Sequence, residues 1–151
     1  MKNWNTIVLF TYGVLSLFFF IKGFRETKIK KNAFGATPYL FLFGIYVWGD
    51  AVVFGAFWFL VTFTSILLND WILFLLILSL FWVVRSFGET IYWLSQQFSK
   101  VNREPPEKLC GYKIFQNESI WFAYQITNQC ISVIALVFSI YLSKVWLLSK
   151  F

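Results

Sequence analysis

Residues 72–84 read ILFLLILSLFWVV, a run in which every side chain except one serine is apolar. A porin-like strand would alternate apolar and polar side chains, so this run favours a helix. Extended to residues 71–97, it supplies the roughly 20 predominantly apolar residues that a helix needs to cross a bilayer. Three further runs are long enough for the same role, at about residues 4–21, 39–68 and 120–147. The sequence therefore predicts an all-α integral membrane protein, a bundle of four transmembrane helices.

The composition agrees with this interpretation. Hydrophobic residues make up 59% of the chain and charged residues 13%, and the mean hydropathy is +0.67, far from the mixture of a soluble domain. Lys2 is the only basic residue before the first apolar run, and no small-x-small cleavage site follows that run. We therefore expect residues 4–21 to remain as a helix rather than to be removed as a signal peptide. We treat residues 1–151 as a single transmembrane domain.

Basic residues predict the orientation in the membrane. The two long loops expected at residues 22–38 and 98–119 hold five and four Lys or Arg residues, whereas the chain ends and the short turn hold only Lys2, Lys144 and Lys150. Cytoplasmic loops carry such an excess, so we expect both loops in the cytoplasm and both termini on the extracytoplasmic side. This reading explains the net charge of +6 without nucleic acid. We expect a multi-pass location in a cell membrane, the prokaryotic inner membrane.

Three ionisable residues fall inside the predicted spans. Arg85 and Glu89 lie one helical turn apart, and Asp50 lies in the preceding helix. Counted from helix ends near residues 38 and 98, Asp50 is roughly 18 Å deep and Arg85 roughly 20 Å deep. These two residues would be level with each other, near the middle of the bilayer. Ionisable groups at that depth are expensive and usually functional.

Further polar residues lie at helical spacing around this trio. Tyr46 precedes Asp50 by one turn, and Tyr92 continues the helix face of Arg85 and Glu89. In the last helix, polar residues recur at i, i+3, i+4 and i+7, ending at Ser132. The predicted ion-binding or substrate-binding residues are Tyr46, Asp50, Arg85, Glu89, Tyr92, Gln125, Asn128 and Gln129. The same residues, above all the amides, could instead serve only as contacts between helices.

Small residues in the second helix point to close packing. Ala51 and Gly55 are four residues apart, a spacing that lets another helix backbone approach. We expect this contact to lie within the chain, with a dimer interface as the alternative.

No catalytic or cofactor motif stands out. Histidine is absent, and Cys110 and Cys130 do not form a closely spaced metal pair. We expect no catalytic residue, no cofactor and no metal, and we favour a transporter or channel for an ion or small solute. Two alternatives stay open: an accessory or scaffold subunit of a membrane complex, and a membrane-embedded lipid-modifying enzyme. The expected partners are the lipid bilayer and either further copies of the chain or a larger membrane complex.

Overall fold

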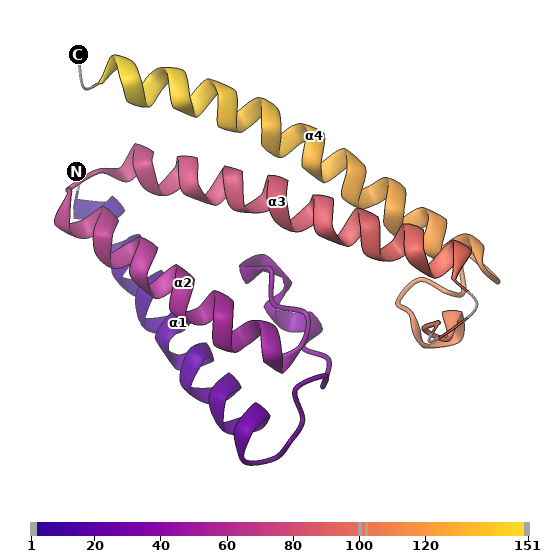
Figure 1. Cartoon of the computed structure of the whole chain (residues 1–151). Coiled ribbons are helices and arrows are strands. Elements are labelled where there is room, and N and C mark those ends of the chain that lie inside the picture. Colours follow the sequence, from indigo (N-terminus) through magenta and orange to yellow (C-terminus); the bar gives the residue numbers. More distant parts are fainter. Residues whose placement is uncertain (1–2, 100, 102, 150–151) are drawn as a thin grey trace. The chain divides into compact units, whose positions relative to one another are not determined.

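Four long helices dominate the computed structural model of the chain, which describes residues 3–99, 101 and 103–149 (Figure 1). They are α1 (Asn3–Lys28), α2 (Trp48–Leu67), α3 (Trp71–Phe98) and α4 (Ser119–Leu148), with short 3₁₀ helices η1 (Pro38–Phe43) and η2 (Pro106–Lys108). Each of the four is long and apolar enough to cross a membrane. The all-α prediction with four such helices is confirmed. Lys2, Lys100 and Lys150, which contribute to the predicted orientation, lie outside the described residues.

Two of the predicted helix boundaries are wrong. The first helix ends at Lys28 rather than at residue 21, because charged residues are good helix formers and continue it beyond the apolar run. Arg25 and Lys28 lie in its last turn, where cations stabilise the helix dipole. The second helix begins at Trp48 rather than at residue 39. The third and fourth helices begin and end within one residue of the predicted positions.

The chain divides into two compact units, Met1–Ile77 and Leu78–Phe151. In the first unit α1 and α2 lie side by side along their lengths (Figure 1). Their backbones are close because small residues meet larger ones: a Cβ added to Gly55 would lie 2.8 Å from the backbone nitrogen of Phe20. Nearer the loop end, a Cβ on Gly23 would lie 2.7 Å from that of Ala51. The predicted small-residue contact of α2 is therefore made within the chain.

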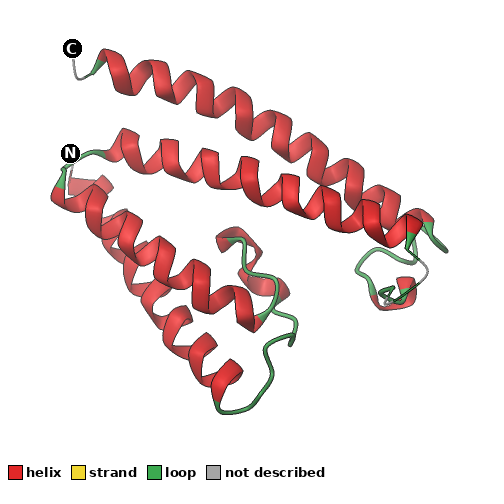
Figure 2. Cartoon of the chain, viewed as in Figure 1, coloured by secondary structure: helices red, strands yellow, loops and turns green. Residues whose placement is uncertain are grey.

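Residues 36–47 form a re-entrant segment, meaning a segment that leaves and returns at the same end of the α1–α2 hairpin (Figure 2). An isolated antiparallel bridge joins Ala36 to Val47 and brings its two ends together. Between them η1 runs to a turn at Gly44, whose left-handed φ of 70° suits glycine. This turn is why the residues before Trp48 cannot be a continuation of α2.

The tip of the re-entrant segment lies beside the middle of the hairpin. Phe43 stacks on Tyr12 with ring centroids 4.5 Å apart, and its carbonyl accepts a hydrogen bond of 3.0 Å from Nε1 of Trp58. Trp58 is ten residues beyond the start of α2, which corresponds to about 15 Å along the helix axis. Leu40 and Ile45 are buried as the segment passes along the helices. Backbone that is not α-helical therefore lies alongside the apolar part of both helices.

In the second unit α3 and α4 are antiparallel neighbours that meet along a seam of mostly small or polar side chains. Ser139 Oγ donates to Ser79 Oγ at 2.9 Å, and Ser132 Oγ donates to the carbonyl of Val83 at 3.2 Å. The seam residues recur at alternating intervals of three and four, as in left-handed helix pairs. On α3 they are Ser79, Val83, Ser86, Thr90, Trp93 and Gln97, and on α4 they are Trp121, Gln125, Asn128, Ser132, Ala135 and Ser139.

The close approach of α1 and α2 predicts the effect of one added methyl group. Gly55→Ala places a Cβ against the backbone of Phe20, which cannot move aside as a flexible side chain could. We expect Gly55→Ala to lower the free energy of unfolding by about 1–3 kcal/mol, the usual cost of overpacking. The measurement is thermal unfolding in detergent, followed by tryptophan fluorescence.

Gly88→Ala is the matched control, because a Cβ at Gly88 of α3 meets nothing within 4 Å. Its midpoint should equal or exceed that of the wild type, since alanine is the better helix former. Equal midpoints for the two variants would contradict the tight α1–α2 contact.

Candidate functional site

Arg85 and Glu89 form an ion pair on α3. The Nη1 atom of Arg85 lies 3.1 Å from Oε1 of Glu89, and the two side chains are only 17% and 15% exposed. The helix itself produces the contact, because residues four apart lie one above the other on the same face. Arg85 is the fifteenth of the 28 residues of α3, so the pair begins at the middle of a helix long enough to cross a membrane.

The ion pair lies on a different face of α3 from the seam. Arg85 directly precedes Ser86 and Glu89 directly precedes Thr90, and both of these followers are buried seam residues. One residue turns the helix by roughly 100°, so the charged face points well away from the line of contact with α4. Packing of α3 on α4 therefore does not require the two charges.

The predicted polar face continues from the ion pair toward the loop end of α3. Tyr92 lies one turn beyond Glu89 and is 41% exposed. Gln96, one turn further, is buried and holds the following loop: its carbonyl accepts from Nε of Arg103 at 3.0 Å, and its Oε1 accepts from the backbone N–H of Glu104 at 2.7 Å. Along this face, Tyr92 is therefore exposed, whereas Gln96 at the loop end is buried and holds the loop in place.

The amides of the predicted stripe on α4 differ in burial and in hydrogen bonding. Gln125 is buried and accepts a 2.6 Å hydrogen bond from Nε2 of Gln97, a partner that the sequence did not indicate. Asn128 is also buried, and its Nδ2 donates to the carbonyl of Tyr124 in its own helix. Gln129 is exposed, about 100° around the helix from Asn128. The three predicted amides therefore differ in burial, and their role in binding stays a prediction.

Asp50 lies at the beginning of α2 rather than halfway along a helix. It is the third residue of α2, and its Oδ2 accepts a hydrogen bond of 3.0 Å from the backbone N–H of Tyr46. The depth predicted for Asp50 is wrong, because that estimate counted residues 39–47 as α-helix. Tyr46 does contact Asp50, through its backbone rather than through a shared helix face. Pairing of Asp50 with Arg85 stays a prediction.

The loop after α3 folds onto the end of the second hairpin. Its Arg103 guanidinium lies 4.2 Å from the ring centroid of Trp121 and forms a 2.9 Å ion pair with Glu118. The hydroxyl of Tyr124 donates to the carbonyl of Cys110 at 3.0 Å. Trp93, Ile120 and Trp121 form the buried cluster beneath these contacts. The sequence did not indicate these contacts of Arg103, because they join residues far apart in the chain.

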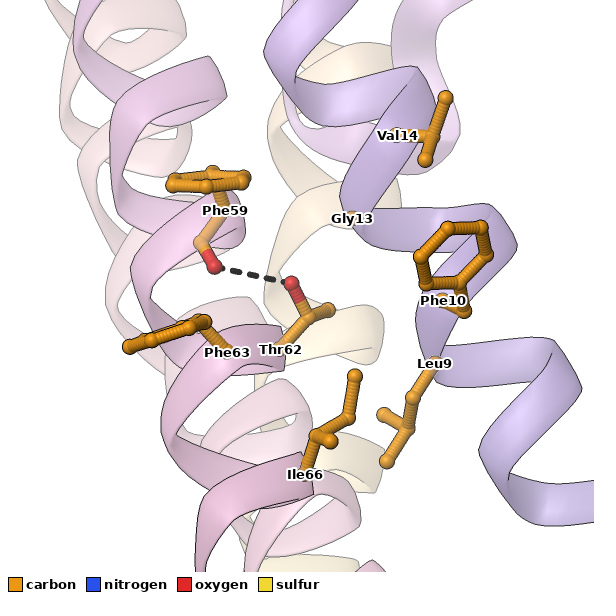
Figure 3. A pocket seen from close by; sticks show the side chains of 8 residues that line it. All are labelled: Leu9, Phe10, Gly13, Val14, Phe59, Thr62, Phe63 and Ile66. Atoms are coloured by element: carbon orange, nitrogen blue, oxygen red, sulfur yellow. Dashed lines mark hydrogen bonds between the residues drawn. The ribbon is translucent and has the colours of Figure 1, made fainter.

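One shallow pocket lies between α1 and α2, with a volume of about 110 Å³ (Figure 3). Its only polar side chain is Thr62, whose hydroxyl donates to the carbonyls of Trp58 and Phe59 in its own helix. The lining residues are Leu9, Phe10, Gly13, Val14, Phe59, Thr62, Phe63 and Ile66. With no ionisable group, this pocket offers nothing that would bind an ion.

Neither a cluster of metal-ligating side chains among the described residues nor a similar known protein was found. Within residues 3–99, 101 and 103–149, no three His, Cys, Asp or Glu side chains are grouped as metal ligands would be, and the thiols of Cys110 and Cys130 are free and exposed. Comparison with protein-family models, with curated proteins and with solved structures finds no match for this chain.

The contact between Asp50 and Tyr46 predicts that a hydrogen-bond acceptor at position 50 matters more than a negative charge. Asp50→Asn keeps an oxygen that can accept from the Tyr46 N–H, whereas Asp50→Leu leaves that donor without an acceptor. We expect Asp50→Leu to cost about 1–3 kcal/mol of unfolding free energy and Asp50→Asn much less. Thermal unfolding of both variants in detergent checks this. Equal losses would show that the negative charge itself is required.

Proposed function

We propose that this chain is a polytopic membrane protein that translocates an ion or small solute, with Arg85 and Glu89 at the centre of its polar site. The observation that supports the proposal is the ion pair halfway along a helix of membrane-spanning length. A charge at the centre of a bilayer costs at least about 2.5 kcal/mol on insertion scales. Since the α3–α4 seam lies on another face, packing of this hairpin does not explain why the charges are there.

Glu89 is the group we assign to proton or cation binding, with Arg85 as its internal counter-ion. An arriving cation would compete with the guanidinium for the carboxylate, so binding and release could alternate with opening of the 3.1 Å ion pair. Tyr92 extends the same face toward the loop end and offers a hydroxyl on the way. Gln125 and Asn128 face the seam and hold α4 in place, so we assign them to positioning.

The orientation follows from the basic residues of the loops. Arg25 and Lys28 end α1, Lys30 and Lys31 follow it, and Arg103 and Lys108 lie in the loop after α3. The positive-inside rule favours a cytoplasmic location for both loops and extracytoplasmic termini.

Cysteine labelling checks this orientation. In a variant with Cys110→Ser and Cys130→Ser, we expect Lys30→Cys and Glu107→Cys to react with a membrane-impermeant thiol reagent only when it reaches the cytoplasmic side. Both positions are exposed, so access decides the result. Labelling of intact cells from outside would reverse the proposed orientation.

Flux measurements test the proposed role of Glu89. Proteoliposomes with an internal pH-sensitive dye report H⁺ movement, and potential-driven tracer uptake reports Na⁺ and K⁺. We expect Glu89→Gln to reduce the flux to that of protein-free liposomes, because an amide neither ionises nor balances Arg85. Glu118→Gln is the matched control: it removes the other carboxylate of an Arg–Glu ion pair, at a largely exposed position, and should leave the flux unchanged.

An unchanged flux in correctly folded Glu89→Gln would rule out this assignment. If the wild-type protein shows no flux of any of these ions but is monodisperse only together with another membrane protein, it is an accessory subunit instead.

A further inference from the structure

The end of α1 and the residues directly after it form a basic surface at the loop end of the first hairpin (Figure 1). One acid, Glu26, lies among five cations, and it pairs with Lys30 at 2.6 Å. The surface keeps a net charge of +4, five cations less one acid. Arg25 and Lys31 are exposed and form no ion pair within the described residues. This basic surface consists of Lys22, Arg25, Lys28, Lys30 and Lys31.

Two of these cations lie over aromatic rings. The Nζ atom of Lys22 is 4.9 Å from the ring centroid of Trp48, the first residue of α2, and that of Lys28 is 5.2 Å from the ring of Phe24. Tyr39 packs edge-on against the same tryptophan, with ring centroids 6.4 Å apart. An aromatic ring attracts an ammonium group without cancelling its charge. The two lysines are therefore held in place and stay positive.

The basic surface begins where the apolar part of α1 ends. The helix extends seven residues beyond Ile21, the last residue of the apolar run, which corresponds to about 10 Å along its axis. The headgroup region on each side of a bilayer is about 5–8 Å thick. This end of α1 therefore crosses the level of the lipid phosphates. Phe24 and Ile29, exposed at 46% and 70%, lie among the cations and offer apolar contacts to acyl chains.

We propose that the basic surface binds the headgroups of anionic phospholipids, such as phosphatidylglycerol. Ammonium and guanidinium groups donate charge-assisted hydrogen bonds to phosphate oxygens, and each Lys or Arg near an anionic bilayer surface strengthens association about fivefold. A lipid fits this surface better than a soluble anion, because the cations lie at headgroup depth and exposed apolar side chains lie among them. The inference goes beyond transport and does not depend on it.

The other long loop does not supply the opposite charge. Residues 98–119 contain four cations and three acids, and one of these acids, Glu118, is paired with Arg103. With a net charge of +1, four cations less three acids, this loop is not complementary to the basic surface, whereas an anionic bilayer is. The same near balance makes the loop a weak attractor of anionic lipid, so its lysines provide a matched control.

Lipid binding to the full chain tests the proposal. The protein in neutral detergent is titrated with phosphatidylglycerol or phosphatidylcholine, and bound lipids are measured by native mass spectrometry. We expect Arg25→Gln combined with Lys31→Gln to weaken phosphatidylglycerol binding about fivefold or more and to leave phosphatidylcholine binding unchanged. Lys108→Gln combined with Lys113→Gln removes the same charge at exposed positions of the other loop and should change neither.

Three results would overturn the proposal. Undiminished phosphatidylglycerol binding by the Arg25 and Lys31 double variant would show that the surface does not meet lipid. Equal losses in the two double variants would show that only the net charge of the protein matters. Displacement of the lipid by inorganic phosphate at constant ionic strength would mark the surface as a site for a free anion. Thermal unfolding of both double variants checks that each is folded.

Discussion

Backbone that is not α-helical, lying beside two apolar helices, must have its N–H and carbonyl groups bonded within the protein, and this requirement shapes the first unit. In the re-entrant segment, Thr37 contributes twice: its N–H donates to the carbonyl of Tyr46 at 2.8 Å, and its hydroxyl donates to that of Ile45. Trp58 bonds the tip, and Asp50 accepts from Tyr46. Side chains of α2 therefore satisfy groups that water would satisfy in a soluble loop.

Polar side chains of the other helices also need hydrogen-bond partners, and most of them find partners, in different places. Most serines, threonines and amides on the α3–α4 seam bond across it or to their own helix, as Ser79 and Asn128 do, whereas the buried hydroxyl of Ser86 has no hydrogen-bond partner among the described residues. Arg85 and Glu89 bond to each other on a different face of α3. Gln129 is an exposed amide on α4. Arg85 and Glu89 are the better candidates for a functional site, because packing of the α3–α4 hairpin does not require their charges.

The sequence predicts the spans better than the polar contacts, for physical reasons. Long apolar runs determine which segments can cross a bilayer, so α3 and α4 begin and end close to their expected residues. The residues before Trp48 are equally apolar, and hydropathy cannot separate a membrane helix from a re-entrant segment. The bond from Trp58 to Phe43, which holds this segment, spans 15 residues and has no local signature.

The sequence left open whether Arg85 pairs with Asp50 or with Glu89, and the structure contains the pair with Glu89. The i, i+4 spacing alone brings Arg85 to Glu89. Asp50 was misplaced because its position depended on the residue at which α2 begins. Which face packs on α3 depends on bonds such as that of Gln97 with Gln125, which join residues far apart in the chain.

Water access to the Arg85–Glu89 face can be measured directly in the intact membrane protein. In the Cys110→Ser, Cys130→Ser background, the reaction rate of Glu89→Cys with a small charged thiol reagent is compared with that of Ser86→Cys, a fully buried position on the seam of the same helix. A translocation site predicts that the thiol at position 89 reacts and the thiol at position 86 does not. Two equally unreactive thiols, in variants that fold normally, would show that no aqueous path reaches the ion pair.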